Sequence, residues 1–413
     1  MKQLATIGFL ALSLSAGATD RIVEEFGSSP TYPSINAAVT AAVDGDRIVV
    51  KNRAGNIPWI EDISVTKSLQ FLSYANNDFF YVQGTYSIVP TTGREVTIIG
   101  MRNTAGSVQA GAGTSAVRGT RVRVVDSYFV NGTINLANQY YDGEVVGCTL
   151  LSGSVSLYYG NVVGSDIDCS ALNDEAISIT GNVGGFPLDT CAIMGNKVKG
   201  RVGYDAVFVS GVNQVFHIRN NYVQHGWSGI NVYDGNTAAV PNLIWNNTVT
   251  AYTGNFSAYG ILIANTSAGS IWEVMNNAVT TTWNGDNRGI WKDSGNNGQL
   301  NVYFNHVTSA ISPSFAISTT FTFAQANTTS QPLTLNADGS LNNAPGCVDG
   351  ANPAAVFSDL DLSTGDAGSY GGSYTLNNFF PLHTGAARTY MTGHPFSIRQ
   401  GSTLRVKAVA FDR

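Results

Sequence analysis

Short apolar segments recur along this chain in two interleaved registers, and this repetition limits the folds that it can adopt. In the first register, eight segments of the type IRNNYV share one small polar position, at intervals of 17 to 31 residues. These positions are Ser127, Cys148, Ser165, Asn196, Asn221, Asn247, Asn277 and Asn305. The second register consists of AISIT, AVFVS, GINVY, GILIA and GIWKD, which begin at Ala176, Ala206, Gly229, Gly260 and Gly289. Each of these starts precedes the next asparagine by 15 to 20 residues, so the two registers advance together.

Each repeat unit is too short to bury a core of its own, so neighbouring units must stack. Its apolar segments are rich in β-branched residues and bounded by Gly, Asn and Asp, which is typical of strands joined by tight turns. No amphipathic helix separates them, which excludes a doubly wound sheet. The pattern therefore predicts an all-β parallel β-helix, a solenoid in which each unit forms one coil.

Stacked coils place equivalent residues of successive units about 4.8 Å apart. Asparagine suits such a column, because it tolerates the left-handed backbone of a tight turn and its amide can bond to the next amide. We therefore expect Asn221, Asn247 and Asn277 to form a continuous ladder.

The beginning of the solenoid is predicted to be covered by a helix. Residues 34–43 have the periodicity of an amphipathic helix with Ser34 as its N-cap, and a turn at 44–46 and a strand at 47–51 follow. A helix here would protect the parallel edge of the first coil from association.

These segments resemble a known family. YPSINAAVTAAVDGDRIVV (32–50) and IEDISVTKSLQFL (60–72) are similar to the N-terminal cap and first coils of secreted right-handed parallel β-helix proteins of the pectate-lyase-like superfamily. Residues 342–372 resemble the motif that follows the last coil in bacterial members. The resemblance covers most of residues 30–372 and implies a right-handed solenoid with an N-terminal capping helix and a C-terminal β-rich cap or tail. It implies no single function, since this fold carries lyases, hydrolases, adhesins and structural proteins.

Composition and the first residues indicate export. Residues 1–18 carry Lys2, an apolar stretch and Ala16-Gly17-Ala18, the layout of a signal peptide. No later apolar run is long enough for a transmembrane span. Charged residues are only 12% of the chain, and the net charge is −6 without a basic stripe, which argues against a nucleic-acid partner. We expect a protein that is secreted, extracellular or held at the cell surface.

The sequence divides into the signal peptide (1–18), a parallel β-helix domain (19–372) and C-terminal capping or docking strands (373–413). Alternating apolar residues in 396–411 predict a small hairpin in the last part. It either caps the last coil or, as a further alternative, offers residues 374–413 for self-association.

The four cysteines, Cys148, Cys169, Cys191 and Cys347, are too few to build a scaffold. Cys169 and Cys191 bracket one irregular segment and are the best pair for a disulfide. Four isolated buried thiols are the alternative. No spacing of Cys or His suggests a metal site.

One exposed face is predicted to contact a glycan. In the second register, Ile177, Val207 and Ile230 point inward, so the residue after each points outward. Aromatic rings with polar neighbours suit sugar rings, whose C–H faces stack while their hydroxyls are hydrogen-bonded. The candidate substrate-binding residues are Tyr204, Phe208, His225, Trp227, Tyr259, Arg288 and Trp291.

Carboxylates on this face are the candidate catalytic residues. Glu175 and Asp205 fall at matching positions of adjacent coils, about 5 Å apart, with Asp174 beside them. Such proximity raises one pKa and leaves an acid beside a base, as glycoside hydrolysis requires. These segments, with His225-Gly226, faintly resemble polygalacturonase-type hydrolases, but no Arg-x-Lys motif follows them in the way it does in those enzymes. A lyase would use calcium, for which Asp166, Asp168, Asp174 and Asp189 could gather; otherwise no cofactor is expected.

Three functional interpretations follow. The first is an adhesive, polysaccharide-binding or extracellular structural element whose partner is an extracellular polysaccharide or cell-surface glycan. The second is a polysaccharide hydrolase or lyase that uses Asp174, Glu175 and Asp205. The third is a subunit of a self-assembling extracellular filament.

Overall fold

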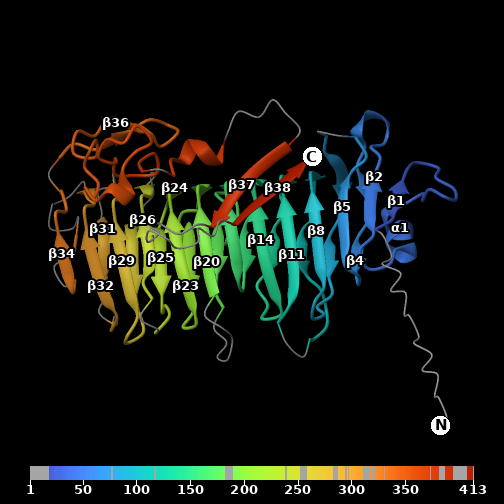
Figure 1. Ribbon diagram of the computed structural model, residues 1–413, viewed down its shortest axis with the longest axis horizontal. Coiled ribbons are helices and arrows are strands. Elements are labelled where there is room, and N and C mark those ends of the chain that lie inside the picture. The colour runs from blue at the N-terminus through green and yellow to red at the C-terminus, as the bar shows by residue number, and fades with distance from the viewer. Residues whose placement is uncertain are drawn as a thin grey trace, which may run out of the picture.

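The computed structural model describes residues 18–75, 78–115, 118–181, 189–237, 240–251, 258–281, 287–293, 295, 297–309, 317–318, 321–329, 331–372, 374–380, 387–393 and 407–412. The expected signal peptide lies almost entirely outside them. The chain winds into a rod of about ten coils, each with one strand in each of three parallel sheets (Figure 1). Parallel connections of this kind are right-handed. The predicted right-handed parallel β-helix is confirmed.

Among the described residues, the three sheets have 13, 11 and 10 strands, and we name them A, B and C. Sheet A contains β1 (Asp20–Val23), β2 (Arg47–Val50), β5 (Leu69–Ser73), β8 (Glu95–Ile99), β11 (Thr120–Val125), β14 (Tyr141–Val146), β17 (Gly160–Val163), β20 (Asp189–Met194), β23 (Gln214–Arg219), β26 (Asn242–Trp245), β29 (Ile271–Met275), β32 (Gln299–Tyr303) and β34 (Phe323–Gln325). Sheet B contains β3 (Trp59–Ile60), β6 (Phe80–Gln83), β9 (Met101–Asn103), β12 (Tyr128–Val130), β15 (Thr149–Leu151), β18 (Asp166–Asp168), β21 (Lys197–Lys199), β24 (Tyr222–His225), β27 (Thr248–Ala251), β30 (Ala278–Thr281) and β33 (His306–Ser309). Sheet C contains β4 (Ile63–Val65), β7 (Tyr86–Ile88), β10 (Val108–Ala110), β13 (Ile134–Leu136), β16 (Val155–Leu157), β19 (Ile177–Ile179), β22 (Val207–Ser210), β25 (Ser228–Tyr233), β28 (Tyr259–Ala264) and β31 (Arg288–Lys292).

The core is one continuous apolar column inside the rod. Most of the short strands alternate, with apolar residues pointing inward and mainly polar residues pointing outward. The inward row of sheet C, for example, runs from Ile177 through Val207 and Ile230 to Ile261, and all four side chains are completely buried. The inward and outward assignment made from the second register is therefore confirmed.

Where sheet A turns into sheet B, the asparagine ladder is present as predicted. It runs through Asn196, Asn221, Asn247, Asn277, Asn305 and Asn327, and each side-chain amide donates to the next Oδ1 across 2.9–3.0 Å. The preceding residue of each turn, such as Asn220 or Asn246, has a positive φ near 50°. This two-residue turn explains why the sequence shows Asn-Asn pairs: the first adopts the left-handed conformation and the second stacks inside the rod.

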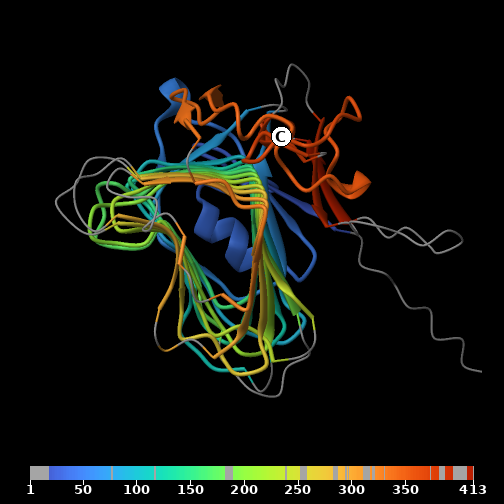
Figure 2. The ribbon, with the colours of Figure 1, turned by 90° about the vertical axis from the view of Figure 1, so that its left-hand side faces the viewer.

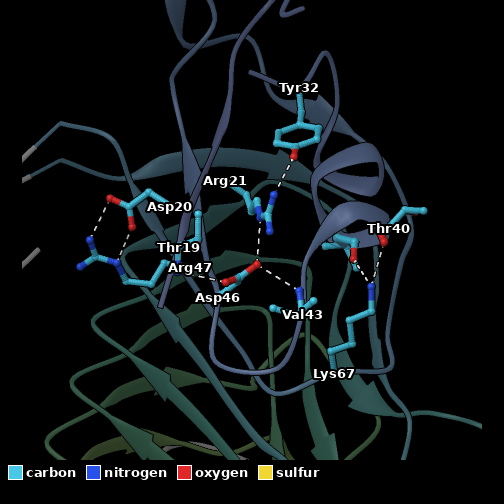
Figure 3. Close-up of polar contacts among 10 residues, drawn as sticks. Thr19, Asp20, Arg21, Tyr32, Thr40, Val43, Asp46, Arg47 and Lys67 are labelled. Carbon is cyan, nitrogen blue, oxygen red and sulfur yellow. Dashed lines mark hydrogen bonds and ion pairs between the residues drawn. The ribbon is translucent and has the colours of Figure 1, made fainter. Parts of the chain in front are cut away.

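The predicted helix α1 (Ile35–Ala41) covers the N-terminal end of the rod; Figure 2 looks along the rod from the opposite end, with the blue helix behind the coils. Ser34 caps it through its hydroxyl, which accepts from the Ala37 amide. Behind the helix, the buried carboxylate of Asp46 accepts from the backbone amides of Thr19 and Val43 and from the Arg21 guanidinium (Figure 3). This network fixes β1 and the turn before β2 to the cap.

After the last coil, the chain runs back along the side of the rod. This return segment (residues 331–380) includes β35 (Thr334–Leu335), β36 (Leu341–Asn343) and the short 3-10 helices Ala355–Phe357 and Leu376–Phe379. Its backbone is bound by the turn asparagines: Asn246 Nδ2 donates to Asp366 O, and Asn220 Nδ2 donates to the carbonyls of Ser369 and Gly371. Residues 342–372 therefore pack along the side of the coils. Their resemblance to a motif that follows the last coil did not indicate this packing.

A C-terminal hairpin is formed by β37 (Ala387–Gly393) and β38 (Lys407–Asp412), which pair antiparallel, but only its second strand overlaps the predicted range 396–411. Residues 394–406, which include much of the predicted range 396–411, lie outside the described residues. Strand β37 contacts β17, so the hairpin lies against the middle of the rod (Figure 1). It does not cover the last coil, contrary to the capping alternative.

The proposed Cys169–Cys191 disulfide is absent, and this prediction was wrong. All four cysteines are free and buried. Cys169 follows β18 and its thiol donates to the Asp174 carbonyl, whereas Cys191 lies in sheet A and contacts Gln214 Oε1. Because Cys169 follows a strand of sheet B and Cys191 lies within a strand of sheet A, closeness in sequence did not bring them together. No helix in the described part of the chain has the length and apolar character needed to cross a membrane.

Candidate functional site

The outer face of sheet C brings most of the predicted site residues together. The strand register aligns one outward row across successive coils, namely Ser178, Phe208, Asn231, Leu262 and Trp291. A second row is formed by the first residues of the strands, in which Ser228, Tyr259 and Arg288 are direct neighbours. Glu175 and Asp205 occupy the matching positions two residues before the inward Ile177 and Val207. The expected alignment of this face is confirmed, whereas its role remains a proposal.

Three carboxyl groups lie near one another just before β19 and β22 of this face. Asp174 accepts from the Ser154 hydroxyl at 2.9 Å and from the Glu175 amide at 3.0 Å. The Glu175 carboxyl is hydrogen-bonded to Asp174, and the charge of Asp205 also reaches it. Burial is the largest cause that raises the pKa of Glu175, and contact with the two neighbouring carboxyls adds to it. Glu175 therefore holds its proton at higher pH than an ordinary glutamate.

Asp205 is the most enclosed of the three, with 9% of its surface exposed. Its Oδ2 accepts from the Asn231 side-chain amide at 2.7 Å. Its Oδ1 makes no hydrogen bond of standard geometry, although Ser228 lies close enough to favour the ionised form. Burial outweighs these contacts and raises the pKa of Asp205.

Aromatic side chains continue the face beyond the carboxyls. The rings of Trp227 and Tyr259 pack edge-on with centroids 6.1 Å apart. The Arg288 guanidinium lies over the Trp291 ring at 4.1 Å and over the Tyr259 ring at 5.5 Å. This arrangement fixes the rings and places a cation among them. The result is a surface with flat apolar patches and a positive charge.

Phe208 and Tyr204 lie closer to the carboxyls than these residues do. Phe208 packs against Tyr233, with centroids 5.7 Å apart. Tyr204 immediately precedes Asp205, and its backbone amide closes a turn onto the Arg201 carbonyl. Both side chains are partly exposed, so aromatic surface extends from the carboxyls to the end of the face.

His225 is not on this face, and the structure corrects its placement. It ends β24 in sheet B, where it aligns with Ala251 and points into the rod with no exposed surface. Its Nδ1 lies 3.2 Å from the Trp227 carbonyl, and burial lowers its pKa to about 4. A neutral histidine in the core cannot contact a polysaccharide on the outside.

The four aspartates considered for calcium do not gather. Asp166 and Asp168 lie on sheet B, Asp174 precedes sheet C and Asp189 begins β20 in sheet A. Within the described ranges, no group of three or more His, Cys, Asp or Glu residues is arranged to hold a metal ion.

Two residues of the site were missed from sequence. Asn231 was assigned to the outward row but given no role, although it binds Asp205. Ser154, which binds Asp174, immediately precedes the inward Val155 of the previous coil. Extending the second register back by one coil would have aligned Val155 with Ile177 and drawn attention to Ser154.

Comparison with known proteins gives a likeness to solved structures, including the two that follow. No family model matches the chain, and no curated protein matches it. A mutant of the periplasmic alginate epimerase AlgG is 13% identical over 69% of this chain and 77% of its own, with a TM-score of 0.43. A mutant of the PL6 family alginate lyase AlyGC is 12% identical over 78% of this chain and 55% of its own, with a TM-score of 0.31. The likeness concerns the fold, so the function has to be argued from the residues of this chain.

Proposed function

We propose that this protein is an exported enzyme that hydrolyses a polysaccharide lying along the outer face of sheet C. The observation that carries the proposal is the contact between the Asp174 and Glu175 carboxyls beside Asp205, at one end of an aromatic surface. A carboxyl group with a raised pKa in contact with a second carboxyl group is frequent in catalytic sites, and Glu175 is such a group. Of the three interpretations of the sequence, this geometry favours the second over a purely adhesive role.

The roles follow from the environment of each carboxyl. Glu175, with its raised pKa and partly exposed side chain, donates a proton to the glycosidic oxygen as that bond breaks. Asp174, held by Ser154, accepts the proton of the attacking water. Asp205 acts as a positioning residue whose charge keeps the proton on Glu175.

The aromatic row supplies binding. Trp291, Tyr259 and Trp227 offer ring faces and edges for stacking against sugars, and Arg288 adds a donor. Together they place several sugar units of a long chain on one side of the carboxyls.

The test is a panel of neutral and acidic polysaccharides incubated with the purified protein, with and without calcium. New reducing ends without unsaturated products are expected, and they should disappear in Glu175→Gln. Glu273→Gln is the matched control, because burial also raises the pKa of Glu273 but it lies on sheet A. Unsaturated products would indicate a lyase, and the absence of cleavage of every polymer would overturn the proposal.

Polysaccharide binding without cleavage is the second candidate. The enclosure of Asp205 by Asn231 favours it, since a carboxyl held in this way can serve structure alone. The two candidates differ in Glu175→Gln: an enzyme keeps binding and loses cleavage, whereas a binding protein never cleaves.

A further inference from the structure

A groove lies between the outer face of sheet B and the return segment. Two cavities of about 230 and 350 Å³ adjoin there, since both are lined by Tyr222, Gln224 and Ala337. One extends over β18 and β21 and the other over β27 and β30, so the groove crosses five successive strands. Four steps of about 4.8 Å make it about 19 Å long, parallel to the rod axis. We call it the sheet B groove.

The floor of the groove is a regular row of hydrogen-bonding side chains. The register of sheet B aligns Asp168, Lys199, Gln224, Thr250 and Thr280, one from each coil. A linear polymer of pyranose units has a repeat close to the coil spacing. Each unit lying along the groove would therefore meet one donor or acceptor of the row.

The wall is held to the floor by direct contacts, so the groove exists before any ligand binds. The Gln224 side-chain amide donates to the Tyr222 hydroxyl at 2.8 Å, and this hydroxyl donates to the Ala337 carbonyl at 3.4 Å. The Tyr370 hydroxyl donates to the Asp338 carbonyl at 3.0 Å. A site formed in advance pays little ordering entropy on binding.

The charges of the groove are nearly balanced. Lys199 pairs with Asp168 at 3.2 Å. The positive charge of Lys197 favours the ionised form of both Asp166 and Asp338, so Lys197 lies near both carboxyl groups. Three carboxylates and two ammonium groups leave no excess positive charge to attract an acidic polymer.

We propose that the sheet B groove binds a neutral, linear oligosaccharide of about four sugar units, separately from the site on sheet C. Hydroxyls suit this floor, because each can donate to a carboxylate and accept from an ammonium, amide or hydroxyl group. An extended peptide would need the edge of a sheet for main-chain pairing, and the groove presents a face. The inference goes beyond the proposed function and does not depend on it.

The test uses isothermal titration of the full-length protein with neutral tetrasaccharides of glucose, mannose, xylose and galactose, and with an acidic tetrasaccharide of uronic acid. Saturable binding of at least one neutral ligand is expected, unchanged by 0.5 M NaCl because no net charge is paired. Thr250→Phe should weaken it at least tenfold by filling the groove. The control is Thr97→Phe, an equally half-exposed outward threonine on sheet A.

Lys199→Met should also weaken binding, since it removes one donor from the floor, whereas Glu175→Gln should leave it unchanged. Thermal unfolding of each variant separates loss of binding from loss of folding. The proposal is overturned if no neutral ligand saturates, if the acidic one binds more tightly, or if folded Thr250→Phe binds like the wild type. Glu175→Gln also separates the two proposals. Loss of polysaccharide cleavage with intact tetrasaccharide binding supports both cleavage at sheet C and binding in the sheet B groove. Because the two are measured independently, each proposal can fail without the other.

Discussion

The side-chain amide of Asn221 donates to Oδ1 of Asn247 across 2.9 Å, and the backbone amide of Asn221 donates to the same oxygen across 3.1 Å. Asn247 in turn donates to Asn277 and to the Ile218 carbonyl. Each ladder residue thus satisfies buried groups of the coil before it and the coil after it. Removing one leaves several of these groups without partners, and each such group costs about 1–3 kcal/mol.

Asn247→Ala is therefore expected to lower the free energy of unfolding by about 3 kcal/mol or more. Denaturant unfolding followed by circular dichroism measures the change. Asn301→Ala is the control, because Asn301 points outward from β32 and its loss should cost less than about 0.5 kcal/mol. Equal effects of the two substitutions would show that the ladder does not stabilise the rod.

A column of glycines lies where sheet B turns into sheet C. A Cβ on Gly106, whose φ is 139°, would lie 2.1 Å from the Gly84 carbonyl oxygen of the previous coil. Gly106→Ala should therefore prevent close stacking of these coils and reduce the yield of folded protein. Gly203→Ala also places an alanine at a positive φ, of 87°, but its Cβ meets nothing within 4 Å, and it should cost only about 1 kcal/mol. Similar melting temperatures for both variants would contradict this account.

The repeat made the coils predictable because strand register follows directly from the period. Once Ile177 and Val207 were aligned as inward residues, the neighbouring positions of Glu175 and Asp205 followed from alternation alone. The same alternation applied to β24 places Gln224 outward and His225 inward. His225 was misplaced because it was assigned to the beginning of sheet C instead of the end of sheet B.

The return segment could not be placed in this way. Its contacts, such as Asn220 with Ser369, join residues about 150 positions apart and have no period. The sheet B groove was missed for the same reason, because its floor follows from the register of β18 to β30 but its wall comes from Ala337 and its neighbours. The predicted disulfide between Cys169 and Cys191 was wrong because the short segment between them runs from the end of a sheet B strand into a sheet A strand.

Trp291→Ala is expected to weaken polysaccharide binding by about 1–2 kcal/mol, which is five- to thirtyfold, because it removes a ring and the face on which Arg288 rests. Affinity electrophoresis in gels that contain the polysaccharide measures the change. Phe323→Ala removes a more exposed aromatic ring from β34 in sheet A and should have no effect. Equal loss in both variants would mean that binding is not located on sheet C.

Asp205→Asn should stabilise the protein at neutral pH. Burial raises the pKa of Asp205 above its ordinary value of 3.8, so the folded state loses stability as pH rises from that value through the raised pKa. Asparagine keeps an acceptor for Asn231 and carries no charge. The melting temperature should therefore rise by about 1–3 °C at pH 7 and remain unchanged at pH 3, as measured by calorimetry. A variant that is less stable at pH 7 would show that the carboxylate is favourably paired.

The same substitution should move the pH dependence of cleavage. Burial, contact with Asp174 and the charge of Asp205 all raise the pKa of Glu175, and Asp205→Asn removes the last of these. Glu175 would then lose its proton at lower pH, so the alkaline limb of kcat/KM should shift to lower pH while the maximum is largely kept. Glu273→Gln should leave the profile unchanged, since Glu273 interacts with Tyr303 on sheet A. An unchanged limb in Asp205→Asn would mean that Glu175 is not the proton donor or that Asp205 does not act on it.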